Sequence, residues 1–295
     1  MTRKLFVIGN GFDLHHGIRS GYSDFGRYVK SADPDVYALI EEYLGIDDDF
    51  WKTFEERLAS FDSDTVIDNA EQFLVSYGSD DWKDSAHHDF EYEIERVVSG
   101  LADGMRGRFA KWIRQLAMPA AGSFTAVRCI DPTAAFLNFN YTPTLQQLYG
   151  VPDSNVLHIH GQASDQDAQI VLGHGWDRSA EDRLSNSVDE DTDTRVAGGY
   201  RLIDDYFART FKPTEQIIKR NRSWFDNLVD VSEVFVLGHS LSDVDESYLR
   251  EVASHVDPAA RWTVSYRSSL THTCERFANF AVPRCTVTFA GLASL

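Results

Sequence analysis

Short apolar runs alternate along the chain with longer segments in which apolar residues recur at helical spacing. The run at residues 4–8 (KLFVI) is continuous rather than alternating, which is typical of a strand in a parallel sheet covered on both faces. Similar runs predict strands at residues 134–140, 155–161, 168–173, 233–238, 261–267 and 285–291. Strands that alternate with helices indicate an α/β protein with an open sheet.

A helical pattern replaces the strand pattern between about residues 20 and 118, where apolar and aromatic side chains recur among charges. We expect one domain over residues 1–295, with a helical insertion at about 31–120 that covers the sheet. Residues 177–199 are polar and acidic and predict a mobile loop or short helices, within a polar loop and helical segment at about 174–230. Further helices are expected from Pro213 and over 243–256.

Composition narrows the classes of function. The formal net charge of −18 argues against a broad nucleic-acid surface and against adhesion to anionic lipid. The sequence contains neither a membrane-spanning apolar segment nor room for a signal peptide before Gly9, so we expect a soluble cytoplasmic protein. The cysteines favour neither a disulfide framework nor a thiolate zinc site, because they are few and lack CxxC spacing: Cys129, Cys274 and Cys285.

Polar or glycine chemistry follows four of the predicted strands. The segments are residues 9–13 (GNGFD), 138–142 (NFNYT), 158–161 (HIHG) and 238–243 (GHSLSD). In open α/β sheets, ligands bind at the carboxyl ends of the strands, where loops from several strands converge. The sequence therefore predicts that these four segments form one site.

The glycines of the first segment have a physical explanation. Gly9 allows a sharp turn, and Gly11 allows backbone N–H groups to approach a phosphate without an intervening Cβ. The next glycine is Gly17, so the GxGxxG dinucleotide fingerprint is absent. An alternative interpretation is a tight strand-to-helix turn in which Asp13 is the N-cap.

The middle segments carry a carboxamide and two imidazoles. Asn140 could orient a water or a sugar hydroxyl, or simply close a turn before Pro143. His158 and His160 lie two residues apart on a predicted strand and so share a face. A histidine there suits a general base, although the same spacing could bind a metal if distant residues completed the ligand set. His174 is a more ambiguous candidate.

The last segment ends a strand in glycine and then begins a helix. Ser240 and the amides around it could hold a ribose or a phosphate. The alternative is structural, because Asp243 followed by Glu246 has the spacing of a capping box.

Taken together, the four segments resemble the AbiH family of bacterial abortive-infection proteins. The resemblance rests on "IGNGFDL", "FNYT", "HIHG" and "GHSLSDVDESYL", in this order over nearly the whole chain. The same order is similar to that of the sirtuin-like superfamily, which implies a Rossmann-like, mostly parallel sheet that binds NAD.

This second resemblance implies roles for individual residues. Asn140 and His160 would be catalytic, with Asn140 orienting the nicotinamide-ribose end or a water and His160 acting as the base. The cofactor-binding positions would be Gly9 and Gly11 at the pyrophosphate, Gly238 and Ser240 at the ribose, and Asn10, Asp13 and Asp243 as further polar positions. Asn10 and Phe12 stand where sirtuins usually have small residues, and Thr142 replaces an aspartate.

The sequence lacks the cysteine-rich zinc module of protein deacylases, so the resemblance favours an antiphage NAD glycohydrolase that needs no metal. The expected partners are NAD or a related nucleotide, and a second copy of the chain or another defence protein. Alternatives remain open: a non-catalytic nucleotide sensor, a metal-dependent hydrolase that uses His158 and His160, or an interaction protein whose glycine turns merely close loops.

Overall fold

The computed structural model describes residues 3–80, 82–83, 87–120, 122–165, 169–267, 269–280 and 286–295. Within them, six strands form one sheet: β1 (Arg3–Ile8), β2 (Ala135–Asn138), β3 (Val156–His158), β4 (Val231–Leu237), β5 (Arg261–Tyr266) and β6 (Thr286–Gly291). All neighbouring pairs of these strands are parallel. The predicted α/β fold with an open, parallel sheet is confirmed.

The described residues also form α-helices and shorter helical turns. The α-helices are α1 (Asn10–His15), α2 (Tyr22–Ala32), α3 (Pro34–Tyr43), α4 (Phe54–Arg57), α5 (Ser63–Glu71), α6 (Asp89–Ser99), α7 (Met105–Arg114), α8 (Thr144–Tyr149), α9 (Thr194–Thr210), α10 (Thr214–Arg220), α11 (Arg222–Asp226), α12 (Glu246–His255) and α13 (Leu270–Ala278). The 3₁₀ turns are η1 (Phe50–Lys52), η2 (Leu58–Ser60), η5 (Asp153–Asn155), η6 (Leu184–Ser187), η7 (Asp243–Asp245) and η8 (Leu292–Ser294), and η4 (Gly100–Gly104) is a π-helical turn.

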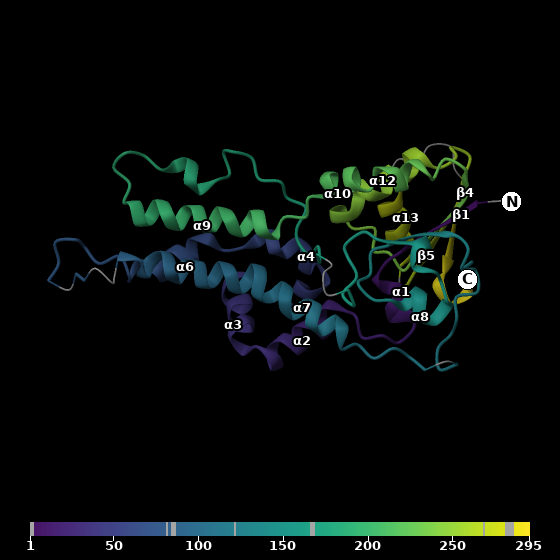
Figure 1. Cartoon of the computed structure of the whole chain (residues 1–295), viewed down its shortest axis with the longest axis horizontal. Helices are drawn as coiled ribbons and strands as arrows, with labels where there is room; N and C mark the ends of the chain where they lie inside the picture. Colours follow the sequence, from purple (N-terminus) through teal and green to yellow (C-terminus); the bar gives the residue numbers. More distant parts are fainter. Residues whose placement is uncertain are drawn as a thin grey trace. The chain divides into compact units, whose positions relative to one another are not determined.

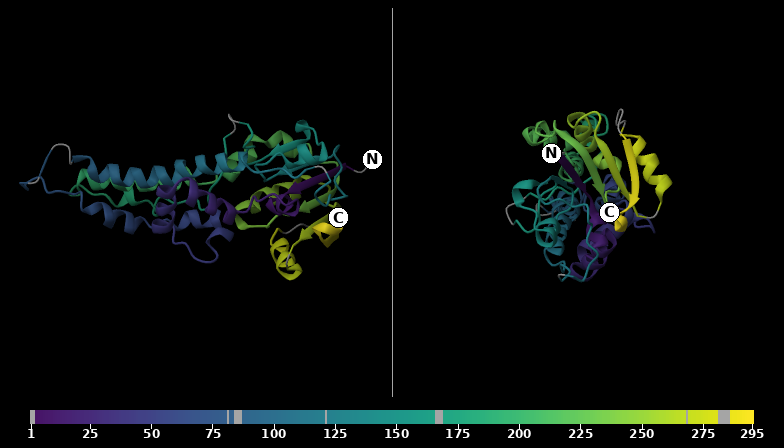
Figure 2. Two further views of the ribbon diagram at one scale, coloured as in Figure 1. Left: turned by 90° about the horizontal axis from the view of Figure 1, so that it is seen from below. Right: turned by 90° about the vertical axis from the view of Figure 1, so that its right-hand side faces the viewer.

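Both faces of the central strand β1 are buried, which explains its continuous apolar sequence. Leu5 and Val7 pack on one face in a cluster that includes apolar residues of α10, α11, α12 and α13. Phe6 and Ile8 point to the other face, where they pack with residues of α1 and α8. β1 lies beside β4 in the middle of the sheet (Figure 2).

The strand order is β3-β2-β1-β4-β5-β6. This is the order of the doubly wound fold that binds dinucleotides, and its topological switch point lies between the first and fourth strands. The loops that follow β1 and β4 therefore start on either side of this point.

Two compact units make up the chain. Unit 1 contains the sheet and comprises residues 1–24, 110–171 and 213–295, and unit 2 is helical and comprises residues 25–109 and 172–212. The expectation of a single domain with an insertion at 31–120 stays a prediction, because compactness alone does not establish which residues fold independently.

The longest helix of unit 2 corrects the sequence interpretation. Residues 177–199 were expected to be a loop or short helices, but α9 begins at Thr194 and runs beside α6 (Figure 1). Gly198 and Gly199 weaken the helical signal, yet both are buried in α9. A Cβ on Gly199 would lie 2.6 Å from Phe90 Cε1, so the glycine permits the close approach of α9 to α6.

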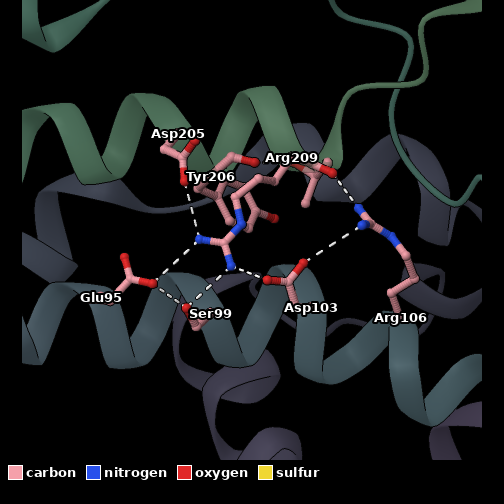
Figure 3. Close-up of polar contacts among 8 residues, drawn as sticks. Glu95, Ser99, Asp103, Arg106, Asp205, Tyr206 and Arg209 are labelled. Atoms are coloured by element: carbon pink, nitrogen blue, oxygen red, sulfur yellow. Dashed lines mark hydrogen bonds and ion pairs between the residues drawn. The ribbon is translucent and has the colours of Figure 1, made fainter.

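An arginine on α9 ties this helix to the π-helical turn (Figure 3). Arg209 Nη1 lies 3.1 Å from Asp205 Oδ2, and Arg209 Nη2 lies 3.2 Å from Ser99 Oγ and also contacts Asp103. Asp103 lies within η4, and Arg106 adds a second ion pair to it. The π-helical turn lies between α6 and α7, so the contact of Asp103 with Arg209 joins α9 to the junction of these two helices.

Two other sequence predictions need correction. The expected strand at 168–173 does not form over residues 169–173, and residue 168 lies outside the described residues. Val171 there donates its N–H to His160 O, at 2.9 Å, rather than joining the sheet. The helix predicted from Pro213 is confirmed at its start but is divided at Asn221 into α10 and α11.

We expect Gly199→Ala to lower the free energy of unfolding by about 1–2 kcal/mol, because its Cβ overlaps Phe90 and Ile94. The control is Gly107→Ala on α7, where a Cβ meets nothing within 4 Å and alanine should stabilise the helix by up to about 1 kcal/mol. Chemical denaturation followed by circular dichroism measures both. Equal effects of the two substitutions would contradict the close packing of α9 on α6.

Candidate functional site at the carboxyl edge of the sheet

The structure brings the starts of all four predicted segments to one edge of the sheet. Ile8, the last residue of β1, is in register with Asn138 of β2 and with Leu237 of β4. Asn138 is in turn in register with His158 at the end of β3. The polar segments that follow these strands therefore begin at the same level in unit 1.

Three glycines allow the turns after β1 and β4 to pack backbone against backbone. Gly9 donates its N–H to Leu237 O at 3.0 Å, and Gly11 donates to Gly238 O at 2.7 Å. A Cβ on Gly238 would lie 2.5 Å from the carbonyl carbon of Gly11, and its φ of +64° also favours glycine. The N–H groups of Gly9 and Gly11 are therefore bonded within the protein, and the placement of this turn at a pyrophosphate stays a prediction.

Asn140 joins the second segment to the first. Its side-chain nitrogen donates to Gly9 O at 3.2 Å, and its backbone N–H donates to Asn138 Oδ1 at 3.0 Å. Both asparagines are buried. The carboxamide thus fixes the glycine turn in this structure, and its predicted catalytic role stays a prediction.

Asp13 is a buried carboxylate rather than the N-cap that the alternative interpretation suggested. The N-cap of α1 is Gly9, and Asp13 lies inside the helix. Its oxygens accept hydrogen bonds from Thr142 Oγ1 at 2.6 Å and Thr144 Oγ1 at 2.7 Å. Burial raises the pKa of Asp13 to about 6, although both hydroxyl donors act in the opposite direction.

The remaining predicted cofactor positions differ in their surroundings. Asn10 is held within the protein, since its side-chain nitrogen donates to Ser20 O at 3.0 Å. Ser240 and Asp243 are exposed, and the carbonyl of Ser240 accepts from Arg276 Nη1 at 3.1 Å. Exposure leaves the Ser240 hydroxyl and the Asp243 carboxylate accessible to a sugar hydroxyl.

The prediction that His158 and His160 share a strand face is wrong, because β3 ends at His158 and His160 lies in a turn. His158 contacts Asn140 O at 2.9 Å and Gln146 Nε2 at 3.0 Å. Its pKa is lowered by burial. His160 lies elsewhere, 5.3 Å from the ring of Phe139 between centroids.

Two functional candidates were missed by the sequence interpretation, Asp245 and His239. Asp245 Oδ1 lies 3.7 Å from His160 Nε2, and Asp245 Oδ2 lies 3.7 Å from His239 Nε2. Both belong to the segment "GHSLSDVDESYL", in which the resemblance implied roles for Gly238, Ser240 and Asp243. The capping box suggested for Asp243 and Glu246 does not form. The N-cap of α12 is Asp245, and among the described residues no side chain caps this helix.

Backbone strain marks the same loop. Leu241 has a φ of +56°, a left-handed conformation that is uncommon for a residue other than glycine. Its side chain is buried, and its N–H donates to His239 Nδ1 at 3.0 Å. Strain of this kind concentrates at functional sites, where surrounding contacts hold it in place.

The alternative of a metal-dependent hydrolase that uses His158 and His160 lacks a set of metal ligands in the part of the chain that the structure describes. No group of three or more His, Cys, Asp or Glu residues in that part has a geometry that could hold an ion. His158 and His160 in particular face different partners.

The fold and site together define an α/β protein with a polar cluster at its topological switch point. Residues 5–266 match the family model described as bacteriophage abortive infection AbiH, so the chain belongs to the AbiH family and has a role in phage abortive infection. Searches of curated proteins and of solved structures found no significant match. Within the described residues, no helix has both the length and the apolar character needed to cross a membrane.

The close contact of the two turns predicts that Gly238→Ala is far more damaging than Gly150→Ala. Both glycines have a positive φ, near +65°, but a Cβ on Gly150 meets nothing within 4 Å. Gly150→Ala should lower the free energy of unfolding by about 1–2 kcal/mol, and Gly238→Ala by a further 1–3 kcal/mol or so. Urea denaturation compares them, and similar losses would refute the contact.

The buried Asp13 carboxyl predicts a distinctive pH dependence. Because its pKa is raised from 3.8 to about 6 on folding, it favours the folded state in full below pH 3.8, and this contribution is lost as the pH rises through about 6. The loss amounts to about 3 kcal/mol. We expect the stability of Asp13→Asn relative to wild type to increase by about 2 kcal/mol between pH 4.5 and 7.5 in urea denaturation, because part of the loss already occurs below pH 4.5. A pH-independent difference would show that Asp13 is not perturbed.

Proposed function

We propose that this protein acts in abortive infection by binding NAD and hydrolysing its nicotinamide–ribose bond. The observation that carries the proposal is the strand order, β3-β2-β1-β4-β5-β6, with the four polar strand ends at its carboxyl edge. In folds of this order, dinucleotides bind at the switch point between the first and fourth strands. The loops that carry Asn140, His160 and Ser240 begin at this edge.

The reaction requires a water, a base and a held ribose. The bond from C1′ to the nicotinamide nitrogen breaks, and its electron pair leaves with nicotinamide. The water oxygen bonds to C1′, and its proton passes to His160 and then to solvent, so the products are nicotinamide and ADP-ribose. Ser240 and Asp243 would contact ribose hydroxyls, and Asn140 would orient the attack. A positioned base of this kind contributes about 10²–10⁴ in rate.

Access to the base is a requirement of this mechanism. His160 is only 2% exposed, and the rings of Phe139 and Tyr248 lie against it. NAD would therefore reach the imidazole only after residues around His160 move. The proposed activity thus includes an opening step, which infection would trigger.

A non-catalytic NAD or ADP-ribose sensor is the second candidate, and the burial of His160 favours it. The same edge of the sheet would then bind the nucleotide through the exposed loop residues without bond cleavage. Nucleotide affinity without turnover, also in extracts of phage-infected cells, would distinguish the sensor from the hydrolase.

Nicotinamide release from NAD, followed by chromatography with and without extract of phage-infected cells, tests the hydrolase. We expect His160→Ala to lower the rate about 10²–10⁴-fold, because the base is lost. Asn140→Ala should lower it as well. His272→Ala is the control, since His272 is exposed on α13. A wild-type protein that releases no nicotinamide under either condition would contradict the proposal, and an active His160→Ala would contradict the site.

A further inference from the structure

Asp245 occupies an unusual position for an aspartate at the start of a helix. It is the N-cap residue of α12, where an aspartate ordinarily accepts hydrogen bonds from the first backbone N–H groups. Within the described chain, its side chain makes no such cap bond. Each of its two oxygens instead faces an imidazole nitrogen at 3.7 Å, on His160 and on His239.

His239 directs an N–H group of its ring toward the Asp245 carboxylate. His239 Nδ1 accepts the N–H of Leu241 at 3.0 Å, so the neutral imidazole carries its hydrogen on Nε2. Nε2 is the atom that lies 3.7 Å from Asp245 Oδ2. His239 therefore presents a donor to one oxygen of Asp245 and leaves the other oxygen to His160.

Aromatic rings hold the two imidazoles in place. Phe139 meets His160 edge-on at 5.3 Å and His239 edge-on at 4.5 Å between ring centroids. Tyr248 lies 5.4 Å from His160 between ring centroids. The side chains of both histidines and of Asp245 are largely buried, at 3%, 2% and 14% exposed. In such surroundings a carboxylate acts strongly on a neighbouring imidazole, because little water screens it.

We propose that Asp245 is a positioning residue for His160, with His239 holding the second oxygen of the carboxylate. The inference rests on the proposed NAD hydrolysis for its functional meaning. When His160 accepts a proton, the Asp245 carboxylate offsets the charge on the imidazolium, as a carboxylate partner of a catalytic histidine does in general. The separation of 3.7 Å is within ion-pair range but beyond a hydrogen bond, so a small movement brings the pair together.

Asp245→Asn tests the role directly, because an amide offers one acceptor oxygen to two imidazoles and carries no charge. We expect a fall of about 10–100-fold in kcat for nicotinamide release, with KM little changed. Asp245→Glu, which restores the charge, should recover part of the rate. The matched control is Glu246→Gln, which removes the same charge one residue later, where the side chain pairs with Arg250 at the surface.

A second readout does not depend on NAD hydrolysis. Nitrogen NMR of protein labelled with ¹⁵N-histidine reports the tautomer of each ring, with assignments from His160→Ala and His239→Gln. We expect the His239 signals of the Nε2–H tautomer in the wild type, and shifts of both the His239 and the His160 signals in Asp245→Asn but not in Glu246→Gln. If Asp245→Asn fails to fold, His239→Gln provides the test through a shift of the His160 signals.

The outcomes separate this inference from the proposed function. Absence of nicotinamide release by the wild type contradicts the hydrolase, while shifted histidine signals in Asp245→Asn still support the contact between Asp245 and the two rings. Full activity of Asp245→Asn, or a rise in KM at unchanged kcat, overturns the positioning role. Histidine signals that are the same in Asp245→Asn and Glu246→Gln overturn it as well.

Discussion

The close contact between the turns after β1 and β4 is the constraint on which the rest of the site depends. Gly9 and Gly11 donate N–H groups to the end of β4, and Gly238 accepts one of them at a distance that leaves no room for a Cβ. The contact fixes the first turn beside the backbone of His239. Asn140 then reaches the carbonyl of Gly9, so three of the four predicted segments become one rigid arrangement. The glycines are needed for this backbone packing, whatever ligand the site binds.

The arrangement gathers buried polar groups at one edge of the sheet. The buried polar residues of this edge are Asp13, Asn138, Asn140, Thr142, Thr144, His160 and His239. Burying a polar group costs free energy unless a hydrogen bond or ion pair compensates it, and a buried carboxylate is costlier still. Burial raises the pKa of Asp13 to about 6, although hydrogen bonds from Thr142 and Thr144 act in the opposite direction. The same edge also carries the strained backbone of Leu241, and strain of this kind concentrates at functional sites.

The sequence predicted the sheet well because burial on both faces leaves a continuous apolar run that can be seen without coordinates. It failed where tertiary contacts override local pattern. The polar, acidic composition of residues 177–199 predicted a loop or short helices, yet Gly198 and Gly199 lie in α9, and Gly199 permits its close packing on α6. The sequence located the four segments but did not predict the direction of their side chains. Asp245 follows His160 by 85 positions. No sequence pattern indicates that the Asp245 carboxylate points at the imidazole of His160 rather than at the start of α12. The roles of the site residues toward NAD stay predictions.

The burial of His160 bears on how such a protein could serve in abortive infection. If the proposed hydrolysis takes place, the enzyme has to be inactive in uninfected cells, and the burial of His160 beside Phe139 and Tyr248 would limit its access to NAD. The strained Leu241 lies two residues from His239, in the loop that ends at Asp245. A left-handed residue costs about 1–2 kcal/mol, which is released if the loop changes conformation. Because Leu241 and Asp245 belong to the same loop, a change of conformation at Leu241 would also move the carboxylate that faces His160.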